Sequence, residues 1–224
     1  AIGTSNGTTG AAILATLDSV KYSNSAGVET TDATDRTDSS KAYYAYKSVP
    51  TLTNVNLPST VLAAGTQTIA KFNIAATGGN PITWKKLILT TTPTGSVTVA
   101  SPILVDENGT TIPTTTATVA ASTGGAVTFV LTNEEEISTS KTYSVKITVG
   151  GTIASGDSIS TSITAGVTSF VTPDDYTAVA ATASTFVWSD KSDVSHDATS
   201  TSILDWNNNY LAKNIPTDSQ TLSK

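Results

Sequence analysis

Two neighbouring segments decide the fold: QTIAKFNIAA at residues 67–76 and ITWKKLILTT at residues 82–91, joined by the turn GGNP at 78–81. Each carries apolar side chains, such as Phe72 and Leu87, that can be buried on one side. Successive side chains of a strand point to opposite faces, so apolar residues at alternate positions are typical of a half-buried strand. Gly, Asn and Pro are typical turn residues. This part of the sequence therefore predicts two consecutive β-strands.

Similar apolar segments recur along the chain about 8–12 residues apart, separated by Gly, Ser or Asn. Thr, Val and Ile are abundant, as in strands. Further strands are predicted at residues 43–47, 51–57, 97–99, 102–105, 111–113, 117–121, 126–132, 142–149, 158–165, 167–171 and 178–188. The pattern predicts an all-β fold, an antiparallel Ig-like or jelly-roll β-sandwich, with the tail from 203 to 222 packed along it. The predicted core comprises Phe72, Ile74, Trp84, Leu87, Leu89, Phe129, Leu131, Tyr143, Val145, Ile147, Phe186 and Trp188.

Two local runs suggest specific turns of the backbone. The run TNEEEIS at 132–138 predicts a short helix, because Thr132 or Asn133 can cap it and the glutamates favour its positive end. The run DENG at 106–109 predicts a hairpin with a type I′ turn, since an Asn-Gly pair readily adopts positive φ angles.

The N-terminal region is predicted to form a separate part: residues 1–42 are a tether, a strand and a linker, and residues 43–224 are the sandwich. The segment AAILATLDSVKY at 11–22 is an apolar strand, followed by a polar linker at 23–41. A lone strand needs a partner edge for its backbone groups. This extended strand arm either folds back on its own sandwich or adds to a neighbouring copy, as in β-augmentation. The candidate donor residues are Ile13, Leu14, Ala15, Leu17 and Val20.

The composition and net charge of the chain argue against several classes of function. Ser and Thr make up roughly a third of the chain, far above the share in ordinary domains. The net charge of −6 argues against nucleic-acid binding, which needs a basic surface. No apolar run approaches the length of roughly 20 residues that spans a bilayer. The chain contains no cysteine, which excludes disulfides and thiol chemistry.

The chain also contains no methionine. A processed, exported protein is one explanation, because removal of a signal peptide removes the initiator; a fragment of a longer protein is the other. Cysteine and methionine are the two residues whose sulfur is readily oxidised, so a chain that lacks both suits a location exposed to oxidants. We therefore expect a secreted protein, extracellular or at the cell surface.

Three aspartates near the C-terminal end are a candidate calcium site. Asp190, Asp193 and Asp197 lie in the run WSDKSDVSHD at 188–197, and Ca²⁺ takes oxygen ligands from flexible loops. Their spacing matches no EF-hand, and a solvated acidic loop is the alternative. No cofactor is expected. Asn6 and Asn108 fit the N-glycosylation pattern, which arises easily in a Thr-rich chain.

The sequence predicts no enzyme. His196 is the only histidine, and the one G-x-S-x-G match, GTSNG at 3–7, lies in the N-terminal tether and not between a predicted strand and a helix, as a nucleophile elbow does. Trp84 and Trp188 lie in strand patterns, as core residues do. Trp206, in the run DWNNNY at 205–210, is the one tryptophan that could face a ligand or a partner, together with Tyr210.

Several segments resemble a known class of module: YKSVPTL (46–52), GTQTIAKFNI (65–74), ITWKKL (82–87), VDENGT (105–110) and the final stretch from STFVWSD (184–190) to the C-terminus. They are similar to β-sandwich modules, often C-terminal, of large Ser/Thr-rich exported proteins of ultrasmall, candidate-phyla bacteria. The resemblance covers about residues 42–224. It implies a β-sandwich, export and surface display, and it brings no catalytic residues.

These observations favour a structural subunit of an extracellular filament or surface fibre, a homopolymer joined head to tail by the N-terminal strand. The alternative is a secreted adhesin or carbohydrate-binding module, with glycans or a host surface as its partner. That alternative needs an exposed aromatic cluster near Trp206 and Tyr210.

Overall fold

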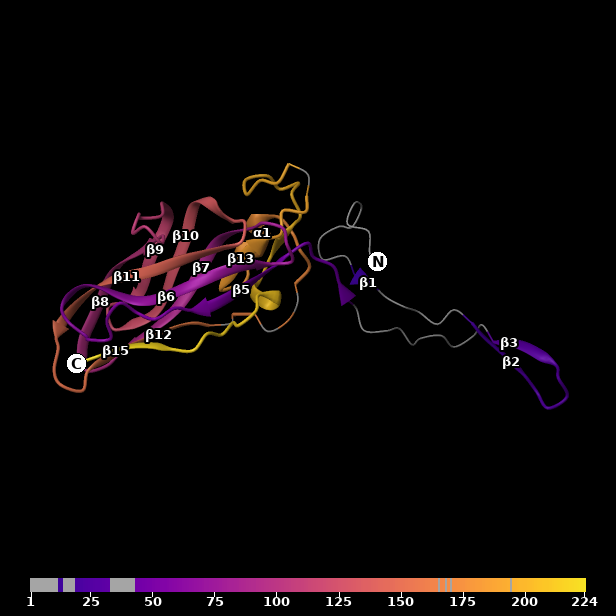
Figure 1. The fold of residues 1–224 in the computed structure, drawn as a ribbon, viewed down its shortest axis with the longest axis horizontal. Helices are drawn as coiled ribbons and strands as arrows, with labels where there is room; N and C mark the ends of the chain where they lie inside the picture. The colour runs from indigo at the N-terminus through magenta and orange to yellow at the C-terminus, as the bar shows by residue number, and fades with distance from the viewer. Residues whose placement is uncertain are drawn as a thin grey trace. The chain divides into compact units, whose positions relative to one another are not determined.

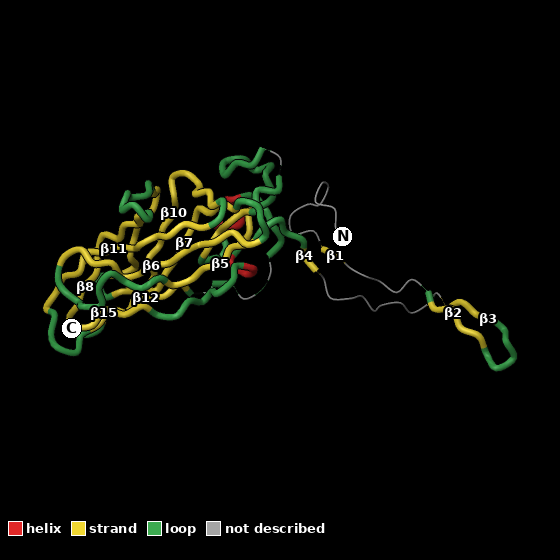
Figure 2. Tube along the Cα trace, in the orientation of Figure 1, coloured by secondary structure: helices red, strands yellow, loops and turns green. Residues whose placement is uncertain are grey.

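The computed structural model describes residues 12–13, 19–32, 43–164, 166–167, 169, 171–193 and 195–224. The chain divides into two compact units, Ala1–Ala45 and Tyr46–Lys224. Figure 1 labels the elements of both units, and Figure 2 shows that strands dominate the second unit and that its helices are short.

The first unit contains two strand pairs. Strand β1 (Ala12–Ile13) pairs antiparallel with β4 (Tyr43–Tyr44). Strand β2 (Val20–Ser23) pairs with β3 (Glu29–Asp32), which lies within the predicted polar linker. The two ends of the predicted donor strand thus have different partners within the unit; Leu14, Ala15 and Leu17 lie outside the described residues.

The turn between β2 and β3 follows from its sequence. The side chain of Asn24 accepts hydrogen bonds from the backbone N–H groups of Ala26 and Val28, at 2.9 and 3.0 Å. Gly27 adopts a φ of +76°, which a residue without a Cβ does at little cost. These contacts close a hairpin that polarity alone did not predict.

The second unit is a sandwich of two antiparallel sheets, as predicted. The larger sheet has the order β14 (Trp206–Asn207), β13 (Phe186–Ser189), β7 (Ile82–Pro93), β10 (Gly124–Ile137) and β9 (Thr114–Ala121), with β12 (Ser158–Ile163) pairing β7 and β15 (Gln220–Ser223). The smaller sheet has the order β5 (Val49–Asn54), β6 (Gly65–Thr77), β11 (Ser140–Thr152) and β8 (Ser96–Val105). Consecutive strands β6 and β7 therefore lie in different sheets.

The core lies between the two sheets. All twelve predicted core residues are buried, which confirms this prediction. At its centre the indole N–H of Trp84 donates to the Tyr143 hydroxyl at 3.3 Å, and the two rings meet edge to face. The Trp84 ring therefore buries a large apolar surface, and its N–H keeps a hydrogen-bond partner inside the core.

The predicted helix at 132–138 is wrong, because this run continues strand β10 to Ile137. Glu135, Glu136 and Ile137 pair with Trp84, Thr83 and Ile82 of β7 after an irregularity in the register. Ile137 is fully buried. The ladder with β7 and the burial of Ile137 outweigh the local helix preference.

Two further local predictions need correction. Residues 178–181, predicted as strand, lie in helix α1 (Tyr176–Ala181), which the Asp175 carboxylate caps by accepting from the N–H groups of Thr177 and Ala178. The described residues of 167–171 are not in a strand. A capping aspartate before an alanine-rich run is a recognisable helix start that strand spacing obscured.

The turn at 106–109 forms, but it is not type I′. Only Gly109 adopts a positive φ there, of +82°. The Asp106 carboxylate instead organises the turn by accepting from the backbone N–H groups of Asn108 and Thr110, at 2.9 and 2.8 Å. An Asx turn of this kind needs one left-handed residue rather than two.

The C-terminal tail packs along the sandwich, as predicted. The N–H of Leu52 in β5 donates to the carbonyl of Lys213 at 3.1 Å, and the N–H of Lys213 donates to the carbonyl of Pro50 at 2.9 Å. Strand β15 then pairs with β12, and Figure 1 shows this part of the tail in yellow beside β12. The tail therefore covers part of the outer edge of β5.

Candidate functional site

A buried charge cluster is the most organised polar site of the described residues. His196 lies between two carboxylates: Nε2 is 2.9 Å from Glu134 of β10, and Nδ1 is 3.0 Å from Asp205. The side chains of His196 and Asp205 are only 5% and 1% exposed. The cluster joins the loop before β14 to the larger sheet.

The position of the His196 ring determines its charge. Burial opposes protonation, but the hydrogen bonds and charges of Asp205 and Glu134 outweigh it and raise the pKa of His196 to about 9. Burial likewise opposes ionisation of Asp205, yet the bonds from His196 and the Asp193 N–H hold the pKa of its carboxyl below the usual value. His196 is therefore an imidazolium at neutral pH, and both of its nitrogens bond carboxylates. A ring held in this way supports the fold and has no free nitrogen for acid–base chemistry.

Trp206 does not provide the exposed aromatic cluster that the binding alternative needs. Trp206 is fully buried, packed against the His196 ring at 5.2 Å between centroids and against Tyr176 edge to face. With Val179, Val187 and Ile203 it forms a second small core. Tyr210 is 45% exposed. The predicted pair therefore does not form a ligand-binding surface, because its tryptophan is needed to hold the loop.

The three candidate calcium ligands each hold a different stretch of backbone. Asp190 is buried and accepts from the N–H of Lys47 at 2.9 Å, and Asp193 accepts from the N–H of Leu204 at 3.2 Å. Asp197 accepts from the N–H and hydroxyl of Thr199. Within the described part of the chain, no group of three or more His, Cys, Asp or Glu residues could hold a metal ion.

We expect chelation to leave the stability of this loop unchanged. An ion bound only to the folded state would raise the melting temperature by mass action, and its removal would lower it. The measurement is the melting temperature with and without EDTA, using added CaCl₂ as the control. A drop of several degrees in EDTA that Ca²⁺ reverses would contradict this interpretation.

The two glycosylation candidates lie in different parts of the chain. Asn6 lies outside the described residues. Asn108 is exposed at the turn between β8 and β9, where its backbone N–H bonds the Asp106 carboxylate.

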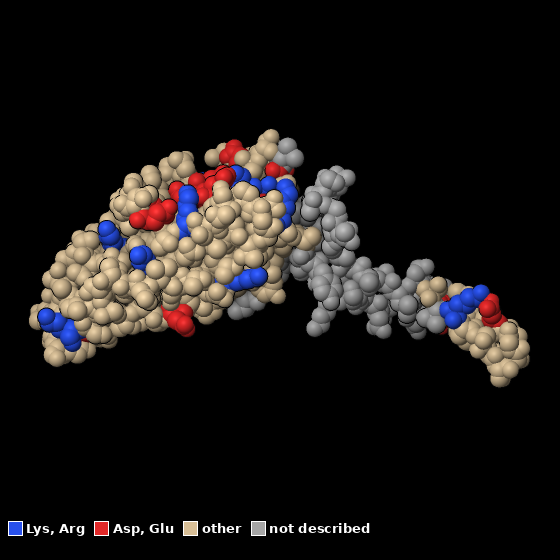
Figure 3. Space-filling view, viewed as in Figure 1, with Lys and Arg blue, Asp and Glu red and all other residues tan. Residues whose placement is uncertain are grey.

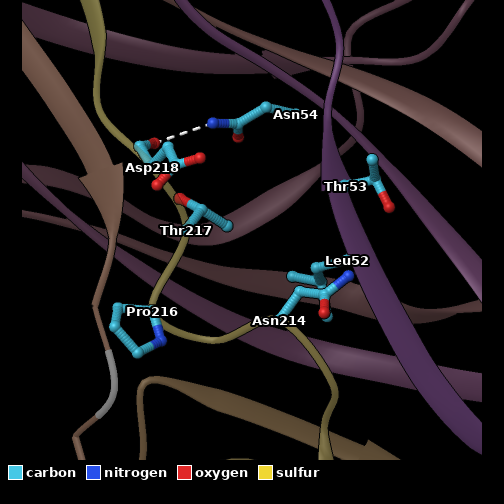
Figure 4. Close-up of a pocket in the computed structure, with 7 residues that line it drawn as sticks. All are labelled: Leu52, Thr53, Asn54, Asn214, Pro216, Thr217 and Asp218. Carbon is cyan, nitrogen blue, oxygen red and sulfur yellow. Dashed lines mark hydrogen bonds between the residues drawn. The ribbon is translucent and has the colours of Figure 1, made fainter.

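A polar groove lies where the C-terminal tail leaves β5. It has a volume of about 420 Å³ and is lined by Leu52, Thr53, Asn54, Asn214, Pro216, Thr217 and Asp218. The Asn54 side-chain amide donates to the Asp218 carbonyl at 2.7 Å and bridges the groove, as Figure 4 shows. Amide, hydroxyl and carboxylate groups of this kind suit a hydroxyl-rich ligand, but the groove lacks an aromatic side chain.

Most outer strand edges of the sandwich already have backbone partners. The edge of β5 bonds Lys213, β14 bonds Asp174, and β15 bonds the segment at Val61. Backbone groups that are bonded in this way are not available to another chain. Strands β8 and β9 are the exceptions among the described edges, because each has one ladder partner, β11 for β8 and β10 for β9.

Comparison with known proteins adds no assignment: no family model matches the chain, and neither a curated protein nor a solved structure matches it. None of the helices in the described part is both long and apolar enough to cross a membrane.

The sequence did not reveal Glu134 and Asp205 as partners of His196. They are 62 and 9 residues away from it, and acidic residues are spread along the chain. The only available signal was that a single histidine lies close to a tryptophan and several aspartates.

Proposed function

We propose that this chain is a structural subunit of an extracellular filament or surface fibre, which polymerises head to tail through its N-terminal unit. The observation that carries the proposal is the exposed hairpin of β2 and β3. Every described side chain from Lys21 to Asp32 is exposed, including the apolar Tyr22 (52%) and Val28 (57%).

Within the described residues, β2 and β3 pair only with each other. Two-stranded hairpins are marginally stable in water, and each outer edge presents backbone groups that can pair with another strand. The turn at Asn24 fixes the hairpin, and the ion pair of Lys21 with Glu29 joins its strands. Both features hold a ribbon together without burying it. Addition to a sheet edge would give it the missing partner.

The mode of joining differs from the filling of an open core. Large side chains of the sandwich, such as Leu52, Phe72 and Trp84, are buried by strands of their own chain. A donor residue that entered this core would therefore have to displace side chains that are already packed. We propose addition at a strand edge, through backbone hydrogen bonds.

The surface also suits a fibre. Figure 3 shows most acidic side chains of the visible face gathered along the upper side of the sandwich, basic side chains scattered over the face, and broad uncharged areas between them. Several of these charges are paired, as Lys141 is with Glu135 and Lys191 with Glu136. Pairing of this kind lowers the repulsion between like subunits, although the chain keeps a net charge of −6. No catalytic role is proposed.

The alternative is a glycan-binding module, and the polar groove beside Asn54 and Asp218 is its best-supported site. The groove without an aromatic platform offers hydrogen bonds but no stacking surface. We therefore rank this function second.

Electron microscopy and sedimentation of the purified full-length chain separate the two functions. We expect concentration-dependent filaments, because one donor and one acceptor on each subunit build an open chain. Monodisperse particles that bind glycans, and lose that binding in Asp218→Ala, would instead support the alternative. Monomers at every concentration would contradict the filament proposal.

A further inference from the structure

The outer edge of β9 has no ladder partner in the described part of the chain, whereas the edges of β5, β14 and β15 bond other segments of the chain. Backbone bonds join this part of the chain to β8 at two points, from Val99 to the Ser122 carbonyl at 2.8 Å and from Ile112 to the Leu104 carbonyl at 2.9 Å. Ile112 and Ser122 are ten positions apart (122 − 112), whereas Val99 and Leu104 are five apart (104 − 99). The two edges therefore cannot pair residue for residue between these points, and no ladder joins β8 to β9.

The sequence of β9 leaves this edge unprotected. Its eight residues, TTTATVAA, contain neither charge nor proline, and Thr115, Thr118, Ala120 and Ala121 are exposed. Natural proteins usually protect edge strands with charges, proline or bulges. The irregularities of the β9–β10 ladder fall at its ends, and Thr116 to Val119 stay in regular register with Val130 to Val127. The middle of β9 is therefore a regular, uncharged edge of high β-propensity.

We propose that β9 is the acceptor edge of the subunit and that it pairs with the β2–β3 hairpin of a second copy. This inference rests on the proposed filament function and specifies its interface. The hairpin is the matching element of this chain, because its side chains are exposed and its Lys21 and Glu29 neutralise each other. An uncharged edge can accept such a ribbon without leaving either charge unpaired.

The pairing makes a heterologous contact. Each subunit would use its hairpin on one neighbour and its β9 on the other, so the contact does not close and the chain grows. Pairing of β9 with β9 of a second copy is the competing arrangement. It would be isologous and would stop at dimers.

Thiol cross-linking of the full-length chain tests this interface, because the protein has no cysteine of its own. Thr118→Cys is combined with Thr30→Cys, or with Thr31→Cys on the other face of β3, and the assembled protein is treated with a flexible bismaleimide. We expect a ladder of dimers, trimers and longer species in a denaturing gel. The matched control replaces Thr118→Cys with Thr148→Cys, an exposed position of β11 inside the smaller sheet, and should give no ladder.

The outcomes separate this inference from the proposed function. Dimers from Thr118→Cys alone would show β9–β9 pairing and overturn the acceptor assignment. Filaments that form with no ladder from either hairpin position would also overturn it, while leaving the filament function standing. Thr118→Lys should suppress assembly and Thr148→Lys should not, and equal effects of the two would count against β9. If the unmodified chain forms no filaments, both proposals fail together.

Discussion

A chain that lacks residues 1–45 should fold and remain monomeric, with complete loss of filament formation. The truncation removes the whole first unit, including the exposed hairpin, and leaves the second unit from Tyr46 onward. The buried core of the sandwich comes from residues of the second unit, from Leu52 to Leu222. The loss of assembly should therefore come without loss of the fold.

Circular dichroism and thermal melting check the fold of the truncated chain, and sedimentation velocity with electron microscopy checks its assembly. Tyr22→Asp in the full-length chain is a milder version, since it places a charge in the exposed hairpin that is proposed to join the subunits. We expect weakened assembly and an unchanged melting temperature. A truncated chain that still formed normal filaments would rule out the arm as the joining element.

Replacing His196 with alanine should cost roughly 3–5 kcal/mol of unfolding free energy, the usual effect of leaving a buried charge without its partner. Asp205 is buried and would lose the hydrogen bond and charge that hold it ionised. The Trp206 ring would lose its neighbour on one side. Thr201→Ala, an exposed change in the same loop, is the matched control and should leave the unfolding free energy nearly unchanged.

The stabilisation by His196 should also depend on pH. Its folded-state pKa, raised to about 9, lies above the ordinary value of 6.5. A group with a raised pKa binds its proton more tightly in the folded state, so its contribution is complete below pH 6.5 and is lost as the pH rises through about 9. Urea unfolding of the wild type and of His196→Ala at pH 6 and pH 10 measures this. The difference between them should be large at pH 6 and small at pH 10; an equal difference at both would contradict the ion-pair assignment.

The sequence predicted the sandwich and its core because the signal is local. Alternation along β6 and β7 identifies which side chains point inward, and Phe72, Ile74, Leu87 and Leu89 are all buried. It could not assign these strands to sheets, and β6 and β7 prove to belong to different ones. Sheet membership depends on contacts between distant segments, which periodicity does not encode.

The errors arose where long-range contacts outweigh local preference. The glutamates at 134–136 suit a helix start, but the ladder with β7 extends the strand through them. Trp206 lies in a strand of only two residues, too short to show alternation, and its burial depends on α1 and the His196 loop. The hairpin of β2 and β3 was missed because its strands are polar, although Asn24 and Gly27 were visible turn signals.

The most direct measurement is the length of filaments grown from mixtures of full-length and arm-deleted subunits. If each subunit donates its N-terminal unit to the next, a subunit without residues 1–45 can accept a neighbour but cannot donate, so it ends the chain. Mean filament length, measured by electron microscopy, should then fall in inverse proportion to the fraction of truncated subunits. Filaments of unchanged length, with the truncated subunits excluded or incorporated along them, would contradict head-to-tail donation.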